Sequence, residues 1–186
     1  VGMWFMLFTL GIVYYMLPQQ LNRPIYSYSL GILAFWTQIL FYTLIGTHHF
    51  VFSSIPWWLQ TVAIVGSVGM VIPVVAGTTN FIMTFKGAWH KIAGSYTLPF
   101  FLVGIVFYFT GSLQGTAEAF RSTNLIWHFT DYCWRTFLAG INWLVVLYYS
   151  VDDRQHFERA NVDTGKTIYR ICCTYGPLLV MAGYWR

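Results

Sequence analysis

Two adjacent histidines and a tyrosine are the residues whose types and spacing could hold a redox metal. His48 and His49 lie in an uncharged stretch, and Tyr42 precedes His49 by seven residues. At about 100° per residue, seven residues of an α-helix return nearly to the same face, about 10 Å further along the axis. Neutral imidazole nitrogens suit copper or haem iron, whereas a segment poor in carboxylates does not suit calcium or magnesium. The pattern indicates a copper or iron site with a phenol deeper in the membrane, or else a polar cap at a helix end.

Membrane-spanning helices are the elements that must position these residues. The chain has 186 residues, of which 57% are hydrophobic and only 9% charged, against roughly 25% charged in soluble domains. No charged residue occurs from Ser27 to Phe85. This run is far longer than the ~20 residues that cross a bilayer core, so it must contain several spans. We therefore expect an all-α, polytopic transmembrane helix bundle.

Apolar segments separated by loops predict five to six spans. Residues 1–150 are expected to hold five transmembrane helices, and residues 151–186 a divergent tail whose one apolar segment spans the membrane or lies at its surface. The apolar run begins at Val1 without a charged leader or cleavage site, which predicts that the sequence starts inside a helix. The segments are Val1 to Leu17, Leu30 to Gly46, Trp57 to Phe85, Leu98 to Leu113, about Leu125 to Ser150, and Ile168 to Trp185.

Basic residues in the connectors predict how the helices are oriented. If the first five segments alternate, six basic residues fall on one side: Arg23, Lys86, Lys91, Arg154, Arg159 and Lys166. The opposite connectors hold only Arg121, so the positive-inside rule places the first group in the cytoplasm and the histidine pair near the outer face. The basic residues form no continuous cationic face, which argues against nucleic acid as a partner. Cys133, Cys172 and Cys173 lack metal-ligand spacing and are interpreted as small apolar residues.

Small or bent positions follow one face of the third segment. They are spaced three or four residues apart, which permits close approach of a neighbouring helix or of a flat cofactor. The positions are Gly66, Gly69, Pro73, Ala76 and Asn80.

Six landmarks occur in the order and near-spacing of the catalytic subunit of cbb-type haem-copper cytochrome c oxidases. They are Arg23-Pro-Ile-Tyr-Ser-Tyr28, Tyr42 with Gly46-Thr-His-His49, Pro56-Trp-Trp-Leu-Gln-Thr61, Lys86-Gly-Ala-Trp-His-Lys91, Ser112-Leu-Gln-Gly115 and His128-Phe-Thr-Asp-Tyr132. The chain resembles this family over about residues 1–132. The resemblance implies that these helices correspond to the sixth through tenth of a twelve-helix subunit I.

The resemblance also implies a function. A respiratory terminal oxidase in the bacterial inner membrane oxidises cytochrome c, reduces dioxygen to water, and takes up and pumps protons. The family holds copper and two b-type haems and works with partner subunits that carry c-type haem.

By this resemblance, His48 and His49 match two of the three histidines that bind the active-site copper. The third is expected before Val1. Tyr42 matches the active-site tyrosine, which in the family is cross-linked to a copper-binding histidine and supplies an electron and a proton to dioxygen.

Further polar residues match other parts of the family's site. Gly31 stands where the family usually has a serine of the single proton pathway from the cytoplasm. Other members of that pathway are matched by Tyr14, Tyr28 and Asn80. Positions near the propionates of the high-spin haem are matched by Asn124 and His128.

The resemblance fails after Tyr132. The family continues with a His-x-His pair that ligates the two haem irons, whereas this chain has Thr136 and Leu138 at those positions. Neither side chain can supply an imidazole, so no haem ligand remains and the isolated chain is expected to be inactive. A shifted reading frame beyond Cys133 is the favoured explanation, and a degenerate paralogue is the other.

Two alternative functions are kept. One is the large subunit of a nitric oxide reductase, which shares the histidine pair but uses iron and nearby glutamates. Tyr42, and the lack of acidic residues between Val1 and Ala117, favour the oxidase. The other is a haem-free membrane scaffold or assembly paralogue, which Thr136 and Leu138 support.

Overall fold

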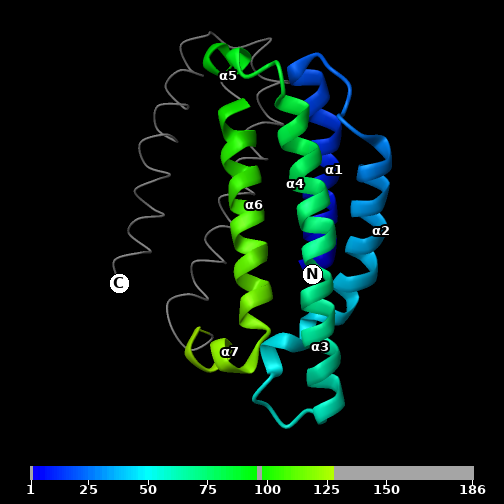
Figure 1. Cartoon of the computed structure of the whole chain (residues 1–186), viewed down its shortest axis with the longest axis vertical. Helices are drawn as coiled ribbons and strands as arrows, with labels where there is room; N and C mark the ends of the chain where they lie inside the picture. Colours follow the sequence, from blue (N-terminus) through cyan, green and yellow to red (C-terminus); the bar gives the residue numbers. More distant parts are fainter. Residues whose placement is uncertain (1, 96–97, 128–186) are drawn as a thin grey trace.

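A computed structural model describes residues 2–95 and 98–127, and every regular element within them is a helix (Figure 1). The all-α class predicted from the sequence is confirmed for these residues. The predicted spans after about Leu125, together with His128, Thr136 and Leu138, lie outside the described residues. The elements are α1 (Gly2–Leu21), α2 (Tyr28–Ile45), the 3-10 helix η1 (Gly46–Phe50), α3 (Trp57–Gly69), α4 (Val71–Phe85), α5 (His90–Gly94), α6 (Leu98–Glu118) and α7 (Arg121–Trp127).

The long helices form one bundle. Helix α2 packs against α3 and α4, and α4 packs against α6, while α1 runs beside α4 along the long axis (Figure 1). Within the described residues, two segments are long and apolar enough to cross a membrane, namely Tyr28–Phe50 and Trp57–Phe85. They coincide with two of the spans predicted from the sequence.

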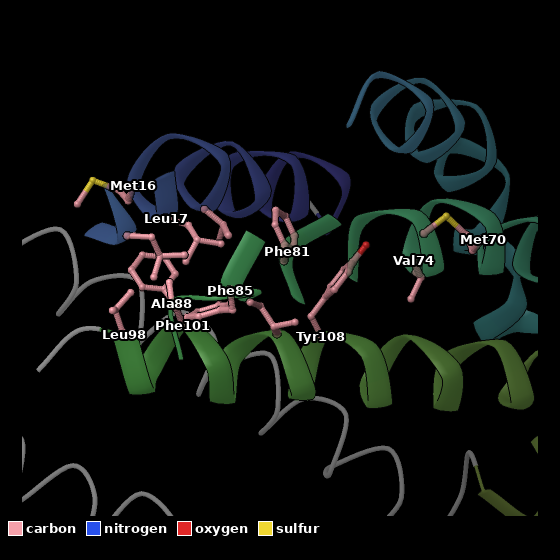
Figure 2. Packing of buried hydrophobic residues seen from close by; sticks show 13 residues of the cluster. Met16, Leu17, Met70, Val74, Phe81, Phe85, Ala88, Leu98, Phe101 and Tyr108 are labelled. Atoms are coloured by element: carbon pink, nitrogen blue, oxygen red, sulfur yellow. The ribbon is translucent and has the colours of Figure 1, made fainter. Parts of the chain in front are cut away.

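A core of aliphatic and aromatic side chains joins α1, α4 and α6 (Figure 2). Leu17, Phe81, Phe85 and Phe101 have no accessible surface. The ring of Tyr108 rises from α6 between Phe81 and Val74 (Figure 2). This core holds α4 in place, and α4 in turn positions the polar residues along its other face.

The third predicted span is not one continuous helix, because the chain breaks at Met70 between α3 and α4. Pro73 lacks a backbone N–H, so it cannot bond the carbonyl of Gly69 four residues earlier. The neighbouring bonds persist, since the N–H of Met70 bonds the carbonyl of Gly66 at 3.1 Å and that of Val74 bonds Met70 at 3.2 Å. Proline therefore interrupts the helix without ending the span.

The small positions of this span are used for packing of one helix on another. A Cβ placed on Gly66 would lie 2.8 Å from Cβ of Leu44, and one placed on Gly69 would lie 2.4 Å from a ring carbon of Phe41. Real Cβ atoms do not approach so closely, so both glycines are required by the contact with α2. Of the two interpretations of this stripe, a neighbouring helix is the one the structure shows at these positions.

We expect Gly69→Ala to lower the free energy of unfolding by about 1–3 kcal/mol, because Phe41 must leave its rotamer or α2 must move away. Gly11→Ala is the matched control, since nothing lies within 4 Å of its Cβ. Thermal unfolding in detergent, followed by circular dichroism, compares the two variants. Equal midpoints would contradict the close-packing argument.

The connectors predicted to share one side do meet at one end of the bundle. A guanidinium N–H of Arg23 donates to the carbonyl of Lys86, and the ammonium of Lys91 donates to the carbonyl of Leu21 at 2.6 Å. This last bond caps the carbonyl end of α1 with a positive charge, which the helix dipole favours. Arg121 lies in α7, at the opposite end (Figure 1).

The connector containing Arg154, Arg159 and Lys166 lies outside the described residues. Within those residues, the separation of basic connectors agrees with the charge argument. Which end faces the cytoplasm stays a prediction.

Candidate functional site

The two histidines lie in η1, the short 3-10 helix that follows α2. Their Nε2 atoms are 3.1 Å apart, and their rings meet edge to face with centroids separated by 4.3 Å. His48 is buried and His49 is exposed. Adjacent residues of a 3-10 helix are about 120° apart around its axis, yet here the ends of the two side chains meet.

The hydrogen bonds of Ser67 determine which nitrogen of His48 carries the proton. The hydroxyl of Ser67 donates its only hydrogen to the carbonyl of Ala63 at 2.8 Å. When it does so, it accepts from Nδ1 of His48, which lies 3.0 Å away. In a neutral ring, Nε2 then carries the lone pair and points toward His49.

The two imidazoles could supply two nitrogen ligands to one metal ion. Two nitrogens that are 3.1 Å apart and each about 2.0 Å from one metal ion, the usual metal–imidazole distance, subtend about 100° at the metal. A histidine that ligates a metal usually donates its other N–H to a fixed acceptor, as His48 does to Ser67. Among the described residues, no group of three or more His, Cys, Asp or Glu side chains could hold a metal ion. The described part therefore brings two imidazole nitrogens together, and their role as metal ligands stays a prediction.

The corner between α6 and α7 fixes the turn that carries the histidines. Asn124, which is buried, donates from Nδ2 to the carbonyl of His48 at 3.3 Å and to that of Glu118 at 2.8 Å. Thr116 donates to the carbonyl of Ser67 at 3.2 Å. Asn124 was predicted to lie near a haem propionate, and in the structure it holds the backbone of the histidine turn.

Glu118 is a residue that sequence reasoning missed. Only 3% of its surface is exposed, and Nε2 of Gln114 donates to its carboxylate at 3.3 Å. The sequence signal was an acidic residue directly after a long apolar run, which in a membrane protein usually marks a functional position. Ser67 was missed because it looks like one of several small residues of its span.

Tyr42 lies on α2 before the histidine turn. It is partly buried and packs against the core formed by α1, α4 and α6. The contacts of His48 include those with Ser67 of α3, Asn124 of α7 and His49. A shared site for Tyr42 and the histidines beside α1 therefore stays a prediction.

Asn80 and Tyr14, two of the residues matched to the proton pathway, are in contact. Asn80 is fully buried, and its Nδ2 donates to the hydroxyl of Tyr14 at 3.3 Å and to the carbonyl of Ser27 at 2.9 Å. Its Oδ1 accepts from the backbone N–H of Ser27 at 2.9 Å. A Cβ on Gly31 would lie 3.4 Å from the ring of Tyr14 and 3.5 Å from Nδ2 of Asn80. A Cβ at this position would therefore make ordinary van der Waals contacts with both side chains.

Tyr28 is not joined to this pair by a described hydrogen bond, and 81% of its surface is exposed. It lines a cavity of about 450 Å³ together with Tyr14 and Gly31. Gln38 and Tyr108 also line it, and sequence reasoning missed both. Gln38 could have been found from its spacing, since it lies seven residues after Gly31 and four before Tyr42.

Comparisons with known proteins agree on one family. The family model described as "Cytochrome C and Quinol oxidase polypeptide I" matches residues 1–149. The chain is 36% identical to the "Cbb3-type cytochrome c oxidase subunit CcoN1" of Stutzerimonas stutzeri over 139 residues, which cover 74% of this chain and 29% of that protein. It is also 36% identical to a "Cytochrome c oxidase subunit 1 homolog" of Agrobacterium tumefaciens, over 66% of this chain and 23% of the relative. The chain thus spans less than a third of the length of either relative.

Proposed function

The chain belongs to the cytochrome c and quinol oxidase polypeptide I family, and from this premise we propose that it supplies part of the copper site and of the proton path of a cbb-type terminal oxidase. The complete enzyme would oxidise cytochrome c, reduce dioxygen to water, and couple this to proton uptake and pumping. The relative named "Cbb3-type cytochrome c oxidase subunit CcoN1" supports this choice.

One observation carries the proposal, which is the geometry of the histidine pair. His48 and His49 present two nitrogens 3.1 Å apart, with the tautomer of His48 set by Ser67. Copper held there would supply a redox metal beside a haem iron. The role of this chain is to keep the lone pair of His48 directed at the metal and to anchor the turn through Asn124. The third histidine would come from the part of the protein before Val1.

The same helices would conduct protons toward the metal. Tyr14 and Asn80 form a hydrogen-bonded pair on the side of the basic connectors, and Tyr28 lies at the surface there. Tyr42 would receive the proton near the metal site. This direction agrees with proton entry from the cytoplasm and a metal site near the outer face.

The proposal also implies a membrane location and partner subunits for the chain. We place it in the bacterial inner membrane and propose α1 and α6 as further spans from their lengths of 20 and 21 residues; of the described segments, Tyr28–Phe50 and Trp57–Phe85 are the two that are also apolar enough. Partner subunits carrying c-type haem would bring electrons from cytochrome c. Residues 1–150 would be the transmembrane part and residues 151–186 a divergent tail.

Removing the hydroxyl of Ser67 tests whether the pair is preorganised. Ser67→Ala should weaken copper affinity about tenfold or more, because outer partners of metal-binding histidines typically contribute 10–100-fold. Thr61→Ala is the matched control, since Thr61 lies on the same helix and bonds its own i−4 carbonyl at 3.2 Å. The measurement is a competition titration of the purified chain with a copper chelator. An unchanged affinity for Ser67→Ala would contradict the role of Ser67.

A haem-free membrane scaffold is the second candidate function. The family match continues to residue 149, past Tyr132, and therefore includes Thr136 and Leu138. A paralogue that lost its ligands would keep the surrounding pattern, and the extent of the family match supports this candidate. The match to the Agrobacterium tumefaciens relative covers 123 residues, and the shifted reading frame stays a prediction from the sequence. As such a paralogue, the chain would retain the bundle and the histidine pair without oxidase chemistry.

A further inference from the structure

A tight turn at the end of α1 fixes the position of Arg23. Asn22 has a left-handed backbone, with a φ of 52°. The N–H of Asn22 bonds the carbonyl of Gln19 at 3.2 Å, and the N–H of Arg23 bonds the carbonyl of Pro18 at 3.0 Å. These two bonds form the Schellman motif, which ends many α-helices. Arg23 is therefore held directly beyond α1, where its side chain is exposed.

The connector between α4 and α5 brings two further cations to this turn. A guanidinium N–H of Arg23 donates to the carbonyl of Lys86, and the ammonium of Lys91 donates to the carbonyl of Leu21 at 2.6 Å. Gly87 permits this approach, because its φ is +80° and a Cβ there would lie 3.1 Å from Nη1 of Arg23. Three positive charges are therefore held together at the end of the bundle that carries α5.

These cations have no acidic partner in the part of the chain that the structure describes. Glu118 is the only acidic residue of that part, and it ends α6 at the opposite end of the bundle from α5 (Figure 1). The ammonium of Lys86 is exposed and forms no hydrogen bond with a described residue. Like charges held this close repel one another. An anion bound between them would therefore stabilise this end.

Exposed apolar side chains border the cations. The backbone N–H of Tyr26 bonds the hydroxyl of Thr84 at 3.2 Å, which places Tyr26 beside the last turn of α4. Ile82 precedes Lys86 by four residues, so it lies one turn deeper on the same face of α4. Tyr26, Ile82 and Trp89 are all exposed, and tyrosine and tryptophan favour the headgroup level of a membrane. A free phosphate would leave this apolar surface uncovered, whereas the acyl chains of a phospholipid would cover it.

We propose that this end of the bundle binds one phospholipid of net negative charge. Its phosphate lies against the side chains of Arg23 and Lys86, Tyr26 and Trp89 flank its ester groups, and its acyl chains run along Ile82. Basic clusters beside membrane helices attract anionic lipids. The site uses none of the metal or proton-path residues, so it does not depend on the proposed function.

Contact quenching in vesicles tests the proposal. A coumarin fluorophore is attached to Gly94→Cys in α5, in a full chain whose Cys133, Cys172 and Cys173 are replaced by alanine. Nothing lies within 4 Å of a Cβ at Gly94, so the label should not disturb the fold. The quenchers are phosphatidylglycerol, which is anionic, and phosphatidylcholine, which is not, with the same acyl chains and a nitroxide beside the ester groups. A nitroxide quenches on near contact, so the signal reports a lipid beside α5.

We expect the labelled Gly94→Cys chain to prefer phosphatidylglycerol about tenfold or more, because each basic residue near the membrane surface favours an anionic lipid about fivefold. Lys86→Gln should lower this preference about fivefold, whereas Lys86→Arg should retain it. The same label on Ser54→Cys, in the exposed loop before α3 at the other end of the bundle, should show little preference. Because the Lys86 ammonium bonds no described residue, neither Lys86 variant should change the thermal midpoint in phosphatidylcholine.

Equal quenching by the two lipids at Gly94→Cys would overturn the proposal. An undiminished preference in a folded Lys86→Gln chain would also overturn it, since the preference would then arise from the overall charge of this end. A preference of the same size at Ser54→Cys would overturn the location of the site. If circular dichroism shows that the labelled Gly94→Cys chain does not fold, the label moves to Ala93→Cys, which is exposed as well.

Inorganic phosphate identifies the source of the anion. Added to the buffer and compared with sodium chloride at equal ionic strength, it should leave the lipid preference unchanged. Loss of the preference would assign the site to a free anion and overturn the lipid as its occupant. The quenching requires neither copper nor oxidase activity, so a failed copper titration would leave the lipid site in place, and equal quenching would leave the histidine site in place.

Discussion

His48→Ala and His49→Ala should each weaken copper binding to the purified chain by more than about 100-fold. Loss of a ligand should exceed the 10–100-fold effect of losing an outer partner, and the described residues hold no group of three or more His, Cys, Asp or Glu side chains that could compensate. The measurement is a chelator competition titration in detergent.

The two variants and one control distinguish ligand loss from unfolding. His48 is buried and bonded to Ser67, so its removal also leaves a void, whereas His49 is exposed and can be removed with little loss of packing. His90→Ala is the control, because His90 is an exposed histidine in α5, at the opposite end of the bundle. If His49→Ala and His90→Ala bound copper equally well, the histidine pair would not be the metal site.

The chain should show no stoichiometric b-type haem signal in a reduced-minus-oxidised absorption spectrum. The resemblance found in the sequence places Thr136 and Leu138 where the family has its haem-binding histidines, and neither side chain offers an imidazole. With no iron ligand, neither haem centre can form, so oxidase activity should also be absent. A known amount of haem added to a parallel sample sets the detection limit.

A stoichiometric haem signal would contradict this prediction. One haem per chain, retained through purification, would show that another residue ligates iron and would remove the scaffold candidate. Its absence together with normal copper binding would support a chain that keeps the copper ligands and has lost the haem ligands.

Much of the fold follows from composition and loop charge. The uncharged run from Ser27 to Phe85 predicts spans, and two of them are confirmed as helical segments of sufficient length and apolarity. The basic connectors near Arg23 and Lys86 predict a shared end, and the structure joins them by a hydrogen bond. These signals are local or additive along the chain, which is why sequence alone can reveal them.

Interruptions within a span are harder to predict. Pro73 was visible in the sequence, yet many membrane helices accommodate proline without a break. The close approach of Gly66 and Gly69 to Leu44 and Phe41, which lie on another helix, is likewise seen only in the structure. Packing between helices is not encoded in the spacing of residues along one of them.

In the candidate site, too, some residues could be identified from the sequence and others only from the structure. His48 and His49 could be identified as a pair because they are adjacent, but their outer partner Ser67 lies nineteen residues further along, on α3. Asn124 reaches the histidine turn from α7, 76 residues away in sequence. Gln38 becomes significant only when its neighbours are known, because an amide in an apolar helix is ordinary until it is found buried without a partner. These residues are therefore identified by their tertiary contacts and not by their spacing in the sequence.

Electron paramagnetic resonance of the copper(II)-loaded chain tests the central claim most directly. If His48 and His49 bind one copper ion, the spectrum of the unaltered chain should show hyperfine coupling to two imidazole nitrogens. His49→Ala should retain coupling to one, and His90→Ala should retain both. A spectrum without imidazole nitrogen coupling, or one that is unchanged when His48 or His49 is replaced, would contradict the assignment of this pair as a copper site.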